Sequence, residues 1–212
     1  MPNETYKLLY MNVRAFGEPI RLFLHYKGIE FEDVRFDRNG FYHAPELKKL
    51  TPYGKVPVLI INDKPIAQSG AILRHLARKF DLNGKNEDEV TKADELLGFI
   101  YDCWGKLNVF PVVFAGLVVP GNKDELFKEY FLPTVDYCLP IMSQLLKSSG
   151  SGYFLPSGLT YVDFTFAEFF NTLSGADSSQ FDKYPELLEH MRRVHSLSGI
   201  REYVEKRPKY LH

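Results

Sequence analysis

The stretch Pro52-Tyr-Gly-Lys-Val-Pro-Val-Leu-Ile-Ile61, which runs on to Gln68-Ser69, decides the fold of this 212-residue chain. Because proline cannot donate to a β-sheet ladder, Pro57 belongs at the beginning or on the edge of the apolar strand. If Val56-Pro57 is a cis bond, the backbone of Val56 faces outward and can pair with an extended, peptide-like ligand. Ser69 is placed to cap the next helix, whose exposed amides would hold a carboxylate. The stretch therefore predicts a site for a small acidic peptide; the alternative is an edge strand with a trans proline and an ordinary cap.

Composition and charge are those of a soluble globular protein, with 45% hydrophobic residues, 25% charged residues and a net charge of −1. This charge predicts no nucleic-acid partner and no binding to an anionic membrane. We see no signal peptide, and the longest apolar run, Val109 to Pro120, is interrupted by Pro111 and too short to span a bilayer. The two cysteines, Cys103 and Cys138, have no metal-ligand spacing. We therefore expect a reduced cytoplasmic protein without disulfides or bound metal.

The first 80 residues alternate between strand and helix patterns. Glu18-Pro19 is typical of a helix start, and Asn62-Asp63 is typical of a hairpin turn. The expected elements are strand 6–12, helix 18–26, strand 31–36, a short helix 46–50, a strand after Pro57, strand 65–67 and helix 69–80. The first strand, helix and strand require a right-handed parallel crossover. This β-α-β-α-β-β-α order predicts a thioredoxin-like α/β domain over residues 1–80.

The rest of the chain has helical patterns throughout. A polar, glycine-containing break at 81–86 predicts a linker, and residues 87–212 predict an all-helical domain. Thr160-Tyr-Val-Asp163 has the form of a capping box. The expected helices cover residues 87–110, 124–147 (irregular at Pro133 and Pro140), a segment from the capping box to 173, 185–196 and 199–206.

Several motifs in this order resemble cytosolic glutathione transferases. They are Tyr6-Lys-Leu-Leu-Tyr10 with Arg14, Gly17-Glu-Pro-Ile-Arg21, Pro52-Tyr-Gly-Lys-Val-Pro57, Gln68-Ser69 and, in the helical part, Thr160-Tyr-Val-Asp163. The likeness covers the whole chain and is greatest to the sigma branch, which includes haematopoietic prostaglandin D synthases and nematode enzymes. The resemblance implies a homodimeric enzyme that uses glutathione as its co-substrate and conjugates it to hydrophobic electrophiles in detoxification.

The resemblance assigns catalysis to Tyr10 and Arg14. A thiol with a pKa of about 8.5 is only slightly ionised at neutral pH, and lowering that pKa by about two units requires about 2.7 kcal/mol. A charge-assisted hydrogen bond from the Tyr10 phenol, about 1.5–3 kcal/mol, supplies much of this stabilisation. Arg14 matches the first of two arginine positions in the sigma pattern, and Phe16 occupies the second. Arg14 either supports the thiolate or pairs with a carboxylate within the fold.

The resemblance also assigns the glutathione contacts. Val56, held by the bond to Pro57, would pair with the cysteinyl unit through its backbone. Gln68 and Ser69 would hold the γ-glutamyl carboxylate.

Five further positions follow from the same resemblance. Lys48 would meet the glycyl carboxylate, with Lys55 near the same end, and Ala44 stands where the family usually has a tryptophan. Asp102 would reach the γ-glutamyl amine in the neighbouring subunit, with Tyr53 packing across that interface.

The second substrate would lie between Tyr10 and the helical domain. Met11, Phe16 and Trp104 are the expected walls, with Tyr161 and Leu211 as further candidates. These side chains favour a flat or flexible apolar electrophile; the alternative is an aromatic stripe that belongs to the core.

Two other functions remain open. One is a glutathione-dependent prostaglandin isomerase, and the other is a non-catalytic protein that binds haem or lipophiles or serves as a crystallin. The presence of Tyr10 and Gln68-Ser69 argues against a crystallin. A glutaredoxin-like role is excluded because neither cysteine lies in the first 80 residues.

Overall fold

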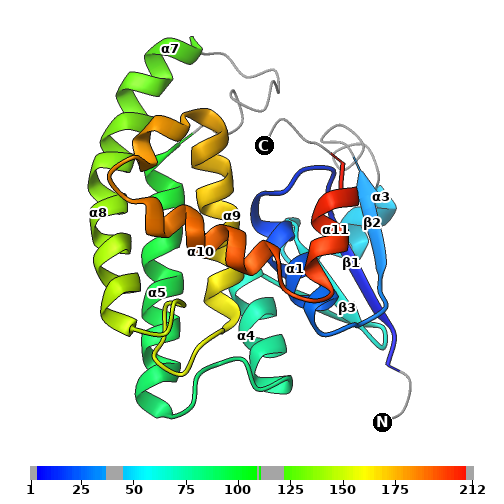
Figure 1. Ribbon diagram of the computed structural model, residues 1–212. Helices are drawn as coiled ribbons and strands as arrows, with labels where there is room; N and C mark the ends of the chain where they lie inside the picture. The colour runs from blue at the N-terminus through cyan, green and yellow to red at the C-terminus, as the bar shows by residue number, and fades with distance from the viewer. Residues whose placement is uncertain (1–3, 37–44, 109, 111–121, 209–212) are drawn as a thin grey trace.

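The computed structural model describes residues 4–36, 45–108, 110 and 122–208, and it consists of an α/β half and a helical half (Figure 1). The α/β half has a four-stranded sheet in the order β2-β1-β3-β4. Its elements are β1 (Tyr6–Met11), α1 (Glu18–Tyr26), β2 (Glu32–Phe36), α3 (Pro45–Lys49), β3 (Val58–Ile61), β4 (Lys64–Ala67) and α4 (Ser69–Lys79). The predicted thioredoxin-like order of elements is confirmed.

The pairing of the strands also agrees with the sequence. β1 runs parallel to β2, as the crossover through α1 requires, and antiparallel to β3. Asn62 and Asp63 form the β3–β4 turn with φ of 47° and 65°, the left-handed values that a two-residue hairpin needs. The Val56-Pro57 bond is cis, as predicted, and Pro57 directly precedes β3.

The remainder of the described chain is helical. It contains α5 (Glu87–Lys106), α7 (Lys123–Leu126), a π-helical turn (Phe127–Phe131), α8 (Leu132–Ser149), α9 (Tyr161–Ala176), α10 (Pro185–His195) and α11 (Ile200–Lys206). Short 3-10 turns cover Ala15–Gly17 and Ser178–Phe181. The long helices α5 and α8 lie on the side away from the sheet, whereas α11 returns to lie beside α1 (Figure 1). The division into two domains at residues 81–86 stays a prediction.

Two helix predictions need correction. The first long helix ends at Lys106, short of the predicted residue 110. The irregularity expected at Pro133 lies earlier, in the π-helical turn Phe127–Phe131, which runs directly into α8 just before Pro133. Pro140 lies inside α8 without ending it.

Helix α9 is the centre of the molecule and packs against α1, α5 and α10. The predicted capping box begins it: the carboxylate of Asp163 accepts from the N–H of Thr160 at 2.7 Å and also contacts Nε2 of His190 at 2.8 Å. Phe164 meets Phe23 of α1 edge-on, with ring centroids 5.6 Å apart. This contact is part of the packing of α1 against α9 that joins the helical half to the α/β half. None of the helices among the described residues is both long and apolar enough to cross a lipid bilayer.

Candidate functional site

A cavity of about 290 Å³ opens between the segment before β3, the start of α4 and helix α5. Its walls bring together five positions predicted for glutathione and one, Phe16, predicted for the second substrate, and add three others. The lining residues are Phe16, Tyr53, Lys55, Val56, Pro57, Ala67, Gln68, Ser69 and Tyr101.

The polar end of this cavity is the beginning of α4. Gln68 is its N-cap, with φ 71° and ψ 114°, and its side chain makes no cap hydrogen bond. A non-glycine residue in this conformation is a strained feature of the kind found at ligand sites. The N-terminal amides of α4 are therefore available to an anion.

The prediction that Ser69 caps α4 was wrong. Ser69 is the first residue inside the helix, so its hydroxyl is turned toward α5 and lies 2.8 Å from the hydroxyl of Tyr101. The cap position, one residue earlier, belongs to Gln68.

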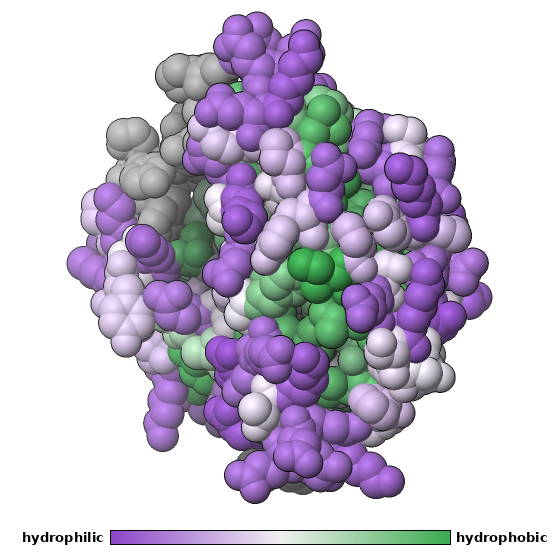
Figure 2. Space-filling model, turned by 90° about the vertical axis from the view of Figure 1, so that its left-hand side faces the viewer, coloured by the Kyte–Doolittle hydropathy of each residue, from purple (hydrophilic) through white to green (hydrophobic). Residues whose placement is uncertain are grey.

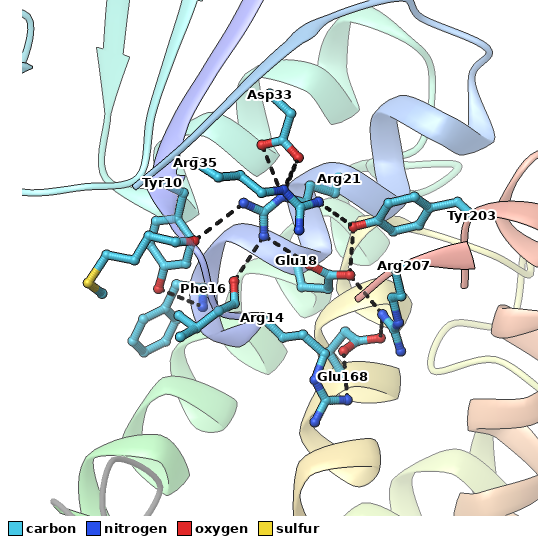
Figure 3. Close-up of polar contacts among 12 residues, drawn as sticks. Tyr10, Arg14, Phe16, Glu18, Arg21, Asp33, Arg35, Glu168, Tyr203 and Arg207 are labelled. Carbon is cyan, nitrogen blue, oxygen red and sulfur yellow. Dashed lines mark hydrogen bonds and ion pairs between the residues drawn. The ribbon is translucent and has the colours of Figure 1, made fainter. Parts of the chain in front are cut away.

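Tyr10 lies near the end of β1 with only 2% of its surface exposed. Its hydroxyl accepts a hydrogen bond from the backbone N–H of Phe16 at 3.2 Å (Figure 3). Burial raises the pKa of Tyr10 to about 12, so the phenol keeps its proton at neutral pH. It is therefore a hydrogen-bond donor and cannot serve as a base.

Gly17 is packed against the Tyr10 ring. A Cβ at this position would lie 2.2 Å from Cδ1 of Tyr10, a distance no real contact allows. Its φ of −83° is open to any residue, so the approach of the ring is what requires glycine here.

Arg21 holds the segment after Tyr10 in place through hydrogen bonds to its backbone carbonyls. The Arg21 side chain is fully buried; Nη1 donates to the carbonyl of Val13 at 3.0 Å and Nη2 to that of Met11 at 3.5 Å (Figure 3). Nη1 also contacts Glu18 at 3.0 Å. Arg21 therefore sets the path of the backbone that delivers the Phe16 N–H to Tyr10.

This network continues into the C-terminal helix. The hydroxyl of Tyr203 donates to Glu18 at 2.8 Å, and Nη1 of Arg207 contacts Glu18 at 2.8 Å and Glu168 at 2.9 Å. Glu168 also contacts Nε2 of His195 at 2.8 Å. Burial alone would raise the pKa of Glu168, but the surrounding cations outweigh it and bring that pKa to about 2.

Arg14 points away from the Tyr10 hydroxyl (Figure 3). Its guanidinium is buried and lies 3.6 Å from the carboxylate of Glu168. Pairing with a carboxylate within the fold is the second of the two roles that the sequence left open.

Comparison with known proteins gives the same family over both halves of the chain. The sequence model for the glutathione S-transferase N-terminal domain matches residues 5–78, and that for the C-terminal domain matches residues 115–207. The chain is 33% identical over 204 residues to probable glutathione S-transferase 9 of Caenorhabditis elegans, covering 96% of this chain and 97% of that one. The chain belongs to the glutathione S-transferase family. It is therefore an enzyme that uses glutathione as its co-substrate in conjugation.

Two solved structures show how far the likeness of this transferase extends. A glutathione S-transferase from the hookworm Necator americanus, described as monomeric, has a TM-score of 0.87 at 32% identity, covering 97% of this chain and 98% of that chain. Prostaglandin synthase D of Nilaparvata lugens has a TM-score of 0.82 at 32% identity, covering 96% and 99%.

The other predicted residues of the transferase lie at varying distances from the cavity. Lys48, on α3, and Asp102, on α5, are exposed and are not among the lining residues. Trp104 is linked to the cavity through Phe16, with ring centroids 5.7 Å apart, and Met11 is half-buried at the end of β1. Ala44 and Leu211 lie outside the described residues.

Tyr161 does not belong to the wall of an electrophile site. Its ring is buried, and its hydroxyl donates to Asp94 at 2.6 Å, so it is part of the core between α5 and α9. The described residues contain no group of three or more His, Cys, Asp or Glu side chains able to hold a metal ion.

Sequence reasoning missed three contributors to this site. Tyr101 lies in the apolar stripe of the predicted helix over residues 87–110 and was given no role in the site. Gly17 and Arg21 were noted only as parts of a motif. Gly17 contacts the ring of Tyr10, and Arg21 contacts backbone carbonyls before the helix, and neither contact can be read from the motif itself.

We predict that Gly17→Ala lowers conjugating activity at least tenfold. The added methyl must displace the Tyr10 ring or the Phe16 amide, and such overpacking costs about 1–3 kcal/mol. The measurements are conjugation of 1-chloro-2,4-dinitrobenzene and urea unfolding. Gly105→Ala is the control, since a Cβ there meets nothing within 4 Å. Equal activity of both variants would show that Tyr10 needs no such close packing.

The charge network predicts a pH dependence of stability. The pKa of Glu168 is about 2 in the folded protein against an ordinary value of 4.5, so its contribution is complete above about pH 4.5 and is lost as the pH falls toward 2. We expect the free energy of unfolding in urea to decrease over this range, and to decrease less steeply in Glu168→Gln. Glu46→Gln, in an exposed pair with Lys49, should keep the wild-type slope. An unchanged slope in Glu168→Gln would contradict this prediction.

Proposed function

We propose that this glutathione S-transferase is a sigma-like, cytoplasmic detoxification enzyme that activates the glutathione thiol with Tyr10. The observation that carries the proposal is a buried phenol with a raised pKa, whose hydroxyl accepts a hydrogen bond from the N–H of Phe16, a residue that lines the cavity. A protonated phenol donates to a thiolate and stabilises it over the thiol by about 1.5–3 kcal/mol. The thiolate is the nucleophile that attacks the electrophile. The buried, free thiols of Cys103 and Cys138 support a reducing compartment.

Glutathione would lie extended along the cavity. The backbone of Val56, presented by the cis bond to Pro57, pairs with the cysteinyl unit. The γ-glutamyl carboxylate lies at Gln68 and Ser69, against the uncapped amides of α4. The glycyl end points toward Lys55, with Lys48 reaching it from α3.

The electrophile would bind where the cavity meets the helical half. Phe16 is 36% exposed and lies edge-on to Tyr101 and tilted against Trp104, which in turn packs on Phe169. With Met11 at the end of β1, these rings offer an apolar wall to a flat hydrophobic molecule. Arg14 pairs with Glu168 within the fold. We therefore assign Arg14 a positioning role and assign stabilisation of the thiolate to Tyr10.

We predict that Tyr10→Phe lowers kcat for conjugation of 1-chloro-2,4-dinitrobenzene by about 10- to 100-fold, the loss of one charge-assisted hydrogen bond. The pKa of the bound glutathione thiol, followed by thiolate absorbance, should rise by about 1–2 units. The control is Tyr6→Phe, which removes another tyrosine hydroxyl of β1. That hydroxyl donates to Glu4, so this variant should keep normal kinetics. Normal activity in Tyr10→Phe would mean that another group activates the thiol.

We further propose that the enzyme is a homodimer. The face on which α8 lies carries a group of apolar side chains within a hydrophilic surround (Figure 2). Tyr53 is 69% exposed at the rim of the cavity, and the exposed Asp102 would reach glutathione in the partner.

Sedimentation equilibrium tests this dimer. We expect twice the chain mass for the wild type and a weaker dimer for Tyr53→Ala, because an exposed aromatic side chain is a typical interface anchor. Lys64→Ala, which changes an exposed residue of β4, should leave association unchanged. A wild-type monomer, as described for the Necator americanus relative, would exclude the proposed role of Asp102.

The prostaglandin isomerase alternative is supported by similarity to the Nilaparvata lugens structure alone. Turnover of prostaglandin H by the purified protein, dependent on glutathione and lost in Tyr10→Phe, would establish it as a second activity.

A further inference from the structure

The hydroxyl of Tyr101 is the contribution of the helical half to the polar end of the cavity. Tyr101 comes from α5 and lines the cavity beside Gln68 and Ser69, which come from the start of α4. Its hydroxyl lies 2.8 Å from the hydroxyl of Ser69, a good hydrogen-bond distance. The role given to Ser69 above, binding the γ-glutamyl carboxylate, does not say what the Tyr101 hydroxyl contributes.

The ring of Tyr101 is held in place by close packing. A Cβ at Gly70 would lie 3.4 Å from Cε2 of Tyr101 and 3.3 Å from Leu97, so α4 and α5 approach closely here. On the other side, Phe16 meets the ring edge-on, with centroids 5.4 Å apart and an interplanar angle of 77°. The position of the Tyr101 hydroxyl relative to Ser69 is therefore set by the packing of the two halves.

The two hydroxyls share one hydrogen bond, and its direction decides what Ser69 offers to a ligand. If Ser69 donates, it presents only lone pairs to the cavity, and these repel a carboxylate. If Tyr101 donates, the proton of Ser69 is free to point into the cavity. A phenol is the more acidic and therefore the stronger donor, and burial keeps Tyr101 protonated by raising its pKa. Donation from Tyr101 to Ser69 is the arrangement that suits an anionic ligand.

We propose that Tyr101 is a positioning residue for glutathione: it donates to Ser69 and so makes the Ser69 hydroxyl a donor to the γ-glutamyl carboxylate. This inference rests on the orientation of glutathione proposed above. It gives the helical half a part in binding glutathione as well as the electrophile. It also separates two tasks, since Tyr101 acts on affinity for glutathione and Tyr10 acts on the thiol.

The test is a double-mutant cycle with Tyr101→Phe, Ser69→Ala and the double variant. Tyr101→Phe keeps the ring and its packing against Phe16 and removes only the hydroxyl. The dissociation constants of glutathione and γ-glutamylcysteine are measured by calorimetry and by fluorescence of Trp104, the single tryptophan of the chain. Tyr184→Phe is the control, because Tyr184 is half-buried at the start of α10 and is not among the cavity-lining residues.

We expect Tyr101→Phe to weaken binding of both peptides by about three- to tenfold, the range of one hydrogen bond. In the double variant the loss should be no greater than in Ser69→Ala alone, because Tyr101 acts through Ser69. The saturated kcat and the pKa of the bound thiol should stay at wild-type values. Tyr184→Phe should bind both peptides normally.

Four results would overturn the inference. Additive losses in the double variant would show that Tyr101 acts on binding independently of Ser69. No loss in Tyr101→Phe, while Ser69→Ala binds weakly, would remove Tyr101 from glutathione binding. Both results would leave the proposed orientation intact. A shifted thiol pKa in Tyr101→Phe would show that this hydroxyl acts at the sulfur. Normal binding by Ser69→Ala would overturn both this inference and the proposed place of the γ-glutamyl carboxylate.

Discussion

The buried ion pair between Arg21 and Glu18 is the interaction on which the arrangement around Tyr10 depends. A guanidinium taken out of water must have its N–H groups satisfied, and Arg21 meets this demand with Glu18, Asp33 and two backbone carbonyls. Those carbonyls belong to Met11 and Val13, one and three residues after Tyr10. The electrostatic requirement of one buried cation thereby determines where the catalytic segment runs.

The other side of this ion pair joins the two halves of the protein. Glu18 accepts from Tyr203 and Arg207 of the C-terminal segment, and Arg207 continues to Glu168 on α9. Buried charge networks contribute little net stability compared with apolar packing, but removing one member leaves its partners unpaired and is costly. The main effect of the network is therefore to specify the relative position of α1, α9 and α11 around the site.

Within the site, the polar and apolar parts come from different levels of structure. The peptide-binding side consists of contiguous backbone, the segment before β3 and the start of α4. The apolar side is a cluster of rings, Phe16, Tyr101 and Trp104, that meet only because α5 packs against the loop after β1. Substitutions at these rings should alter the choice of electrophile more readily than the binding of glutathione, with Tyr101 contributing to both.

Local chemistry in the sequence determined the order of elements, the hairpin at Asn62 and Asp63, the capping box of α9 and the position of Pro57 before β3. These features depend on neighbouring residues, so a single sequence is sufficient to predict them. Tertiary structure alone decided that Arg14 pairs with Glu168, that Gly17 makes room for Tyr10 and that the Ser69 hydroxyl turns from a cap toward Tyr101. Each of these depends on the meeting of segments far apart in the chain or on the packing of one ring. A local pattern indicates that a residue is polar or small, but its partner is known only once the two halves are assembled.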